Sequence, residues 1–320
     1  MNGTRKTNKS GKLVIMSLIG VFIVLLVGRQ FLLDQTTEID PPAPSHFPNR
    51  FDRDRATVQR ASLGKMLFHD PLLSLHQQIS CASCHQQAAA YADPGKSTST
   101  GDLSVKTERN SPTLVNLAWK KQFFADGRAT KLEETIENAV LDPKELNSDF
   151  DCIIIPRIRK NSLYSQKFRR LFGNRTIHKD DIILVLTDYL RTLNSFHAKY
   201  DEVMQGRAQF TTQEKEGLEI FTAACQSCHV PPLFHSQGLI ASCRSGNQDI
   251  NALVAPTLRN IEFTSPYGYT GAYPRLDSLL IVHEIQWAGS SYPRTVKEVA
   301  ALKAFLYTLS DHSFTSNTAY

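Results

Sequence analysis

The chain has 320 residues, 41% of them hydrophobic and 21% charged, with a formal net charge of +5. This composition is that of an ordinary globular protein and excludes both a disordered chain and a protein with several membrane spans. The basic residues are spread along the chain, so no nucleic-acid partner is expected, and the charge gives only weak support to an acidic protein partner. The sequence contains no P-loop, no dinucleotide-binding glycine motif and no repeat of solenoid period.

The first predicted element is a membrane anchor. A basic tail, residues 1–12, precedes an apolar stretch, and residues 13–33 are long enough to span a bilayer. No small-residue cleavage site follows, so we expect an uncleaved signal anchor, with the tail in the cytoplasm and the rest of the chain in the periplasm at the inner membrane. A cleaved signal peptide is the alternative. Residues 34–55 contain four prolines and predict a stiff polar tether.

The patterns that follow are mainly helical. Apolar residues recur at helical spacing over residues 63–67, and Thr211 with Glu214 forms a capping box before a helix. Residues 181–193 and 295–309 predict further amphipathic helices. Because alternating strand patterns are scarce, the predicted fold class is mainly α.

Two short motifs carry the chemistry. "CASCH" (81–85) and "CQSCH" (225–229) both have the spacing C-x-x-C-H, in which two thiols bind a haem covalently and the adjacent histidine reaches its iron. A zinc ribbon is the alternative, but its cysteine pairs lie closer in sequence and need no histidine after both. The motifs predict two haem c groups held by Cys81, Cys84, Cys225 and Cys228, with His85 and His229 as proximal ligands. Cys152 and Cys243 form either a disulfide or two buried thiols.

Six stretches occur around these motifs in an order that is informative: "LGKMLFHDPLLSLHQQISCASCH" (63–85), "RNSPTLVN" (109–116), "FFADGR" (123–128), "LDPKEL" (141–146), "EGLEIFTAACQSCHVPPLF" (216–234) and "APTLRNIEFTSPY" (255–267). Together they resemble the dihaem cytochrome c peroxidase family, which includes the methylamine-utilisation (MauG) branch. The resemblance extends from Leu63 to Asp311. It implies two cytochrome c-like domains, here residues 56–200 and 201–320, each with one haem.

The resemblance also implies an activity. The first haem would be the site where hydrogen peroxide is reduced to water, and the second would take electrons from a small c-type cytochrome or cupredoxin. Glu145 matches the acid–base glutamate of the family, although a solvated glutamate at a helix end is the alternative. Asn110 and the backbone carbonyls of Val254 and Pro256 match a calcium site between the domains, with a metal-free turn as the alternative. Members of the family are often homodimers.

The first haem site departs from the family pattern. Many members carry a histidine after the first motif that caps the resting haem, but no histidine or methionine lies between His85 and His178. We therefore expect an open or water-filled sixth position. Tyr91 could approach it, although a tyrosine in such a place is more often a packing residue. Ala125 replaces the tryptophan relay that usually precedes "DGR", and Thr135 replaces a glutamine near the peroxide. Electron transfer between the haems would then need another group or through-space coupling.

The second haem site departs as well. The run "LLIVHEIQW" (279–287) lies where the family supplies the distal ligand, a methionine in peroxidases and a tyrosine in the MauG branch. Here His283 occupies that position, and no methionine follows Met204. At helical spacing His283 shares an apolar face with Leu276, Leu279, Leu280 and Trp287. A core histidine is the alternative, but we expect His229 and His283 to ligate the second iron, which lowers its potential relative to methionine ligation.

These observations support three functions. A periplasmic dihaem peroxidase is favoured by Glu145 and by the open first haem. A MauG-like oxidase acting on a protein or small molecule is favoured by Ala125 and His283. A dihaem electron carrier without catalysis would need a closed first haem, so binding of cyanide or carbon monoxide there separates it from the other two.

Overall fold

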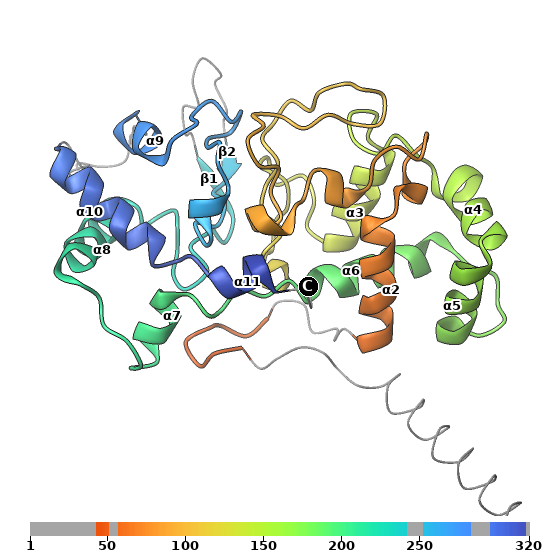
Figure 1. Ribbon diagram of the computed structural model, residues 1–320, viewed down its shortest axis with the longest axis horizontal. Helices are drawn as coiled ribbons and strands as arrows, with labels where there is room; N and C mark the ends of the chain where they lie inside the picture. The colour runs from red at the N-terminus through yellow and green to blue at the C-terminus, as the bar shows by residue number, and fades with distance from the viewer. Residues whose placement is uncertain (1–42, 51–56, 242–251, 283–294, 318–320) are drawn as a thin grey trace, which may run out of the picture.

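A computed structural model describes residues 43–50, 57–241, 252–282 and 295–317 of the chain. The predicted cytoplasmic tail and signal anchor lie outside the described residues, as do His283, Trp287 and Cys243. The described part is mainly helical, as predicted, and Figure 1 shows helices gathered into two groups, with α2 and α6 in one and α8 and α10 in the other.

The first domain is built around a pair of packed helices, α2 and α6. Helix α2 begins after Thr57, whose hydroxyl accepts a hydrogen bond from the Arg60 backbone, and α6 follows the predicted periodic stretch closely. The first CxxCH motif comes after α2 and opens with a short 3₁₀ turn. The α-helices are α2 (Val58–His69), α3 (Leu132–Leu141), α4 (Ile155–Lys160), α5 (Ser162–Phe172) and α6 (Lys179–Arg191).

The second domain repeats this plan with α8 and α10. The predicted capping box is confirmed, because the Thr211 hydroxyl accepts from the Glu214 backbone and the Glu214 carboxylate accepts from the Thr211 backbone at 2.7 Å. A two-stranded antiparallel sheet pairs Ile240 with Leu253. The elements are α7 (Lys199–Met204), α8 (Thr212–Ala224), β1 (Leu239–Ala241), β2 (Ala252–Val254), α9 (Leu276–Val282), α10 (Val296–Tyr307) and α11 (His312–Ser316).

A glycine lets each helix pair approach to backbone contact. A Cβ atom on Gly64 of α2 would lie 1.8 Å from the carbonyl oxygen of Val185 on α6, and one on Gly217 of α8 would lie 2.0 Å from that of Ala301 on α10. No side chain fits at either crossing, so glycine is required at both by close approach. The two crossings are therefore equivalent points of two similar domains.

Equivalent residues of the two domains are separated by one constant offset in residue number. The offset in residue number between Cys81 and Cys225 also separates Asn116 from Asn260, two asparagines with left-handed backbones at φ 56° and 62°. The same offset separates the loops 123–129 and 267–273, each closed by a bridge between its end residues. The chain is an internal duplication whose period is far longer than that of a solenoid, which is why a search for short repeats missed it.

Two segments, residues 43–50 and helix α11, connect the two domains. The N-terminal strap, residues 43–50, belongs to the segment expected to be a free tether, but Phe47 is only 9% exposed and packs on Trp119, Phe196 and Leu233. Its neighbour His46 lies 2.9 Å from Asp201. In Figure 1 the strap runs below the junction of the two groups of helices. An apolar side chain within this proline-rich stretch is what docks it.

At the other end, α11 returns to the first domain. Phe314 is buried in the core of that domain, 5.8 Å from the ring of Tyr91, and its carbonyl accepts a hydrogen bond from the Gln87 side chain. The expected boundary at residue 200 separates the two haem motifs, while the strap contacts the second domain and α11 contacts the first. Both segments therefore oppose separation of the domains.

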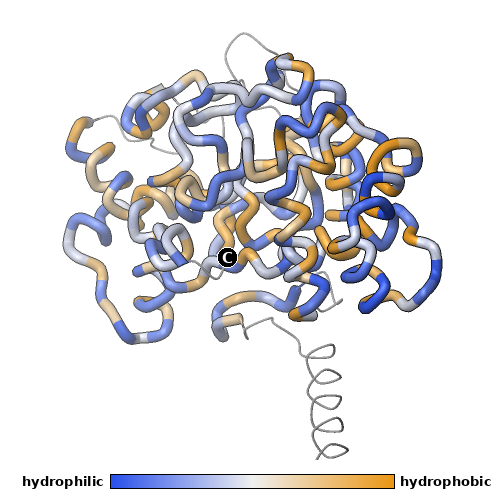
Figure 2. The backbone as a smooth tube through the Cα atoms, turned by 45° about the vertical axis from the view of Figure 1, so that its right-hand side comes forward, coloured by the Kyte–Doolittle hydropathy of each residue, from blue (hydrophilic) through white to orange (hydrophobic). Residues whose placement is uncertain are grey.

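Figure 2 shows hydrophobic and hydrophilic residues alternating along the helices. Within the described ranges, none of the helices has the length and apolar character needed to cross a bilayer. Helix α5 buries one face, through Tyr164 and Phe168, whereas α6 is buried on nearly all sides.

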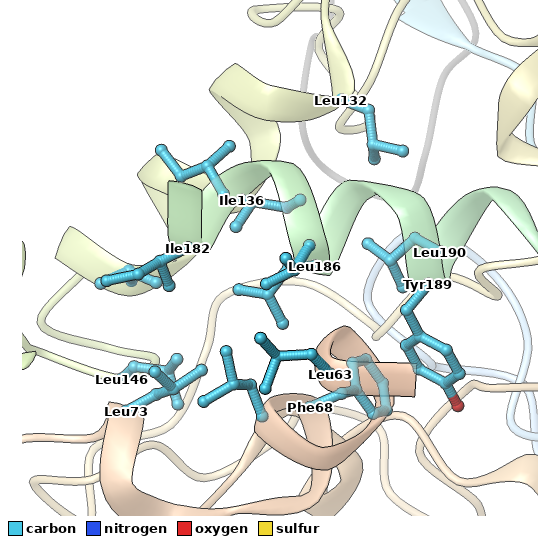
Figure 3. Close-up of a cluster of buried hydrophobic side chains, with 14 of the residues drawn as sticks. Leu63, Phe68, Leu73, Leu132, Ile136, Leu146, Ile182, Leu186, Tyr189 and Leu190 are labelled. Atoms are coloured by element: carbon cyan, nitrogen blue, oxygen red, sulfur yellow. The ribbon is translucent and has the colours of Figure 1, made fainter. Parts of the chain in front are cut away.

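Figure 3 shows where the first domain buries its apolar faces. Leu63 and Phe68 of α2 face Leu186 and Tyr189 of α6, and Ile136 of α3 closes the group from the side. Several of these side chains have one surface on a cavity, so the same cluster that holds the helices together also forms a wall of the site described next.

Candidate active site at the junction of the domains

A cavity of about 840 Å³ extends along both domains. Both CxxCH motifs open into it, through Cys81, Cys84 and His85 on one side and Cys225, Cys228 and His229 on the other. Its walls are mainly apolar: Phe68, Leu132, Ile136, Leu186 and Leu190 from the first domain, and Ile261, Leu276, Leu280, Leu302 and Leu306 from the second. An apolar cavity with thiols and an imidazole in each half suits a flat hydrophobic cofactor in each.

Both motif histidines are oriented by backbone carbonyls. Nδ1 of His85 donates to the carbonyl of Tyr91 at 2.8 Å, and Nδ1 of His229 donates to those of Phe234 at 3.2 Å and Pro256 at 3.0 Å. Because a carbonyl only accepts, Nδ1 carries the proton and Nε2 is left to bind a metal. Burial also lowers the pKa of His85 and so favours the neutral imidazole that ligation requires.

The zinc alternative finds no support. The two CxxC pairs lie in different domains, and no group of three or more His, Cys, Asp or Glu side chains is placed to hold a metal ion in the part of the chain that the structure describes. A structural zinc site needs four such ligands converging on one point. The donor sets fit two separate haems, each attached through its own motif.

Comparison with known proteins agrees with this fit. A family model described as di-haem cytochrome c peroxidase matches residues 58–209. The methylamine utilization protein MauG of Methylorubrum extorquens is 31% identical over 70% of this chain and 68% of its own length. Cytochrome c551 peroxidase of Nitrosomonas europaea is 30% identical over 78% of this chain and 79% of its own length. The chain belongs to the di-haem cytochrome c peroxidase family.

Membership in this family confirms an oxidoreductase with two covalently bound c-type haems. The fold agrees with solved structures. A MauG-like protein associated with microbial copper homeostasis superposes with a TM-score of 0.77 at 24% identity, covering 88% of this chain and 98% of that one. The diheme peroxidase BthA from Burkholderia thailandensis superposes with a TM-score of 0.69 at 22% identity, covering 87% and 94%. At these identities the likeness is one of fold.

Glu145 lies in the cavity beside the first motif. It lines the cavity, and after burial its charge is the largest influence that raises the pKa of the Cys81 thiol, to about 12. Burial, followed by the charge of Asp142, raises the pKa of Glu145 itself to about 7, while Arg128 opposes the shift. Its carboxylate has no hydrogen-bond partner among the residues that the structure describes. Glu145 and the first CxxCH motif thus line the same cavity, and its acid–base role stays a prediction.

The backbone of Glu145 is fixed by a neighbouring loop. Its carbonyl accepts from the Asp102 backbone at 2.8 Å, and a Cβ atom on Gly101 would lie 2.2 Å from the Lys144 carbonyl. Asp102 is fully buried, and its carboxylate holds both the backbone and the ring of His76, the latter at 2.7 Å. The acid–base candidate thus sits on a rigid support that the motif "PKEL" alone did not reveal.

Tyr91 does not approach the cavity. It is 1% exposed, its hydroxyl lies 3.1 Å from that of Tyr189, and it is absent from the cavity lining. Ala125 and Thr135 do line the cavity. No described side chain takes the place of the missing capping histidine. The described cavity lining agrees with an open position at the first haem, which stays a prediction.

Two equivalent hydrogen bonds join the domains at the cavity. The Val254 backbone donates to the carbonyl of Ala125 at 2.8 Å, and the Asn110 backbone donates to the carbonyl of Tyr269 at 3.0 Å. By the duplication offset, Val254 corresponds to Asn110 and Tyr269 to Ala125. Each domain therefore places its loop, 123–129 or 267–273, on the other in the same way, and both loops face the space between the two motifs.

The candidate calcium ligands lie at this junction. Asn110, Val254 and Pro256 all line the cavity. The Asn110 amide donates to the carbonyls of Lys96 and Ser97, both at 3.2 Å, and the Pro256 carbonyl accepts from His229. The structure thus gives Asn110 and Pro256 roles that need no metal, while leaving the amide oxygen of Asn110 and a lone pair of Pro256 for one.

His283 lies outside the described residues. The apolar helix face that it was predicted to share belongs to α9, which is described up to Val282. Leu276, Leu279 and Leu280 all line the cavity, and Leu276 is 3% exposed. Sequence reasoning also missed Lys120 in the cavity lining, because a lysine in a stretch of mixed character carries no motif.

Proposed function

We propose that the chain is a periplasmic dihaem peroxidase that reduces hydrogen peroxide at its first haem with electrons received at its second. The reaction consumes one peroxide, two protons and two electrons and yields two molecules of water. The observation that carries the proposal is Glu145, a carboxylate with a pKa near neutrality in an apolar cavity beside the first CxxCH motif.

The motif residues hold the cofactors in this proposal. Cys81 and Cys84 would attach the first haem and Cys225 and Cys228 the second, while His85 and His229 would bind the two irons. The haem irons supply the redox chemistry. The carbonyl acceptors on Nδ1 fix both rings and raise their basicity as ligands.

Glu145 moves the proton. As the carboxylate it accepts a proton from the oxygen of peroxide that approaches the first haem, and as the acid it returns that proton to the departing oxygen. A pKa near 7 gives comparable amounts of both forms at neutral pH, which suits a group that acts in both directions. The bond from Asp102 to the Glu145 carbonyl keeps the side chain in place through both steps.

We propose His283 as the distal ligand of the second haem. The apolar residues that precede it on α9 line the cavity, which supports this assignment. Imidazole on both sides lowers the haem potential, so the electron donor, a small c-type cytochrome or cupredoxin, needs a correspondingly low potential. We also propose a calcium ion bound by Asn110 with the carbonyls of Val254 and Pro256, since amide and carbonyl oxygens suit this ion.

A MauG-like oxidase is the second candidate. Ala125 leaves the space between the domains without the aromatic side chain found at that position in many relatives, and a low-potential second haem stabilises oxidised iron. Both features favour slow removal of electrons from another substrate over rapid peroxide turnover. For either function we propose a periplasmic location, with residues 13–33 as the anchor in the inner membrane.

The test is peroxide consumption by the haem-loaded protein with reduced cytochrome c, beside Glu145→Gln and a control, Glu219→Gln, which makes the same change on the exposed side of α8. We expect rapid turnover that falls about 10²–10⁴-fold in Glu145→Gln only. Equal activity in all three proteins would contradict the assigned role. Oxidation of both haems by peroxide with little turnover would favour the oxidase.

A further inference from the structure

A lysine occupies the cavity without a carboxylate beside it. The cavity lining contains four Lys or Arg side chains. Arg109 and Arg128 both bind Asp126, at 2.9 and 3.0 Å, and Lys144 pairs with Glu108. Lys120 has no ion pair with any carboxylate of the described ranges. Each of these three cations thus has a carboxylate partner, with Asp126 shared by two of them, while Lys120 has none among the described residues.

Lys120 lies where the domains meet. It follows the 3₁₀ turn Leu117–Trp119, and its ammonium is 5.9 Å from the ring centre of Phe123 in the core of the first domain. Its charge also contributes to lowering the pKa of His235, a buried residue of the second domain, although burial is the larger cause. The ammonium is therefore close to side chains of both domains.

Its surroundings are poorly suited to a lone cation. Burial lowers the pKa of Lys120 to about 8, and no neighbouring carboxylate counters that shift. His235 offers no compensation, because its Nδ1 is engaged with the Ser236 carbonyl and its Nε2 is buried without a partner. Removing a cation from water without an anion is costly, so the site calls for a negatively charged partner.

The two haems supply such partners. A haem attached to either CxxCH motif through its vinyl groups would carry two propionate carboxylates. Both motifs and Lys120 line one cavity, so these carboxylates would be anions available to its ammonium. We propose that Lys120 binds a haem propionate at the junction of the domains and so raises the reduction potential of that haem.

The proposal rests on the two haems and not on peroxidase activity, so it is tested by potential rather than by turnover. A spectroelectrochemical titration of the haem-loaded protein is compared with Lys120→Gln, Lys120→Met and Lys120→Arg. Lys121→Gln serves as the matched control, because Lys121 is the exposed neighbouring lysine. Haem content per chain is measured for every variant.

Loss of the ammonium removes a positive charge that favours the reduced haem. We expect Lys120→Gln and Lys120→Met to lower the potential of one haem by about 59 mV, a tenfold change in its ratio of reduced to oxidised iron. Lys120→Arg retains the charge and should keep both potentials near the wild-type values, as should Lys121→Gln.

Two results would overturn the proposal. One is a fully haem-loaded Lys120→Met protein with both potentials unchanged. The other is an equal shift in Lys120→Arg and Lys120→Met, which would make packing rather than charge the cause. If Lys120→Gln loads poorly, Lys120→Met decides, because its unbranched apolar side chain can pack beside Phe123 without adding an unpaired polar group.

Discussion

The two domains are alike around the histidines of their CxxCH motifs and differ in the rest of the cavity wall. In both, a glycine brings two helices into backbone contact and a carbonyl from a left-handed residue, Tyr91 or Phe234, orients the motif histidine. On the other side of the cavity the first domain presents Glu145, while the second brings the leucines of α9. The two halves therefore share the helix crossing and the orientation of the motif histidine, and they differ in the other residues that line the cavity.

The largest expected effect concerns the distal acid of the first domain. Below about pH 7 Glu145 becomes protonated and cannot accept the peroxide proton, so the rate of peroxide reaction should fall as pH decreases through that value. In Glu145→Gln the rate should be about 10²–10⁴-fold lower and should lose this acid limb. Stopped-flow measurement of the haem spectrum from pH 5 to 8 follows both. An unchanged acid limb in the variant would assign it to another group.

The next effect tests whether the two helix crossings are equivalent. Gly64→Ala and Gly217→Ala each place a methyl group within 2.0 Å of a backbone carbonyl. Each should cost about 3 kcal/mol of unfolding free energy, because the helices must separate. Denaturant unfolding of the haem-loaded variants measures the loss. A loss at one crossing only would show that the domains differ in their cores as well as in their distal sides.

The distal side of the second domain is tested by His283→Met. Thioether ligation favours reduced iron, so the potential of the second haem should rise by an amount on the order of 0.1 V, within the range that axial ligands span. Redox titration followed at the haem absorption bands reports the change. The first haem serves as an internal reference. If neither potential moves, His283 is a core histidine.

The smallest effect concerns the support of Glu145. Burial would raise the pKa of Asp102, but hydrogen bonds from His76 and Ser74 keep it below its ordinary value. A depressed carboxyl pKa contributes stability above pH 3.8 that is lost as pH falls through the folded value. His76→Ala should remove about 1 kcal/mol at pH 7, less at pH 3, since His76 is half-exposed.

Thermal unfolding at the two pH values measures this difference. The second domain, which is not in contact with His76, should keep its haem spectrum throughout. A loss as large at pH 3 as at pH 7 would mean that packing, and not the ionised Asp102, is what His76 supports.

Many features of this structure could be predicted from the sequence because they depend only on residues close together in the chain. The capping boxes, the helical periods of α6 and α10 and the spacing of both CxxCH motifs need no knowledge of distant residues. Glu145 was predictable only through the order of six stretches around it. Each of these signals lies within a few residues or in a family pattern.

The remainder depends on contacts between segments far apart in sequence. The sequence predicts that Phe47 belongs to a tether, because the neighbouring residues contain no sign of its contacts with Trp119 and Leu233. Lys120 is one of many lysines, and only the fold shows that the other cavity cations already have carboxylates. Long-range packing and charge balance are properties of the whole cavity, so no short window contains them.

The strap also sets an order of assembly. Its residues are synthesised early, yet the surface that receives Phe47 combines Trp119 and Phe196 with Leu233 of the second domain. That surface exists only after both domains have formed, so docking of the strap is a late, high-contact-order event in folding. The strap, although it precedes both domains in sequence, thus docks after them, and its docking requires that both domains have formed.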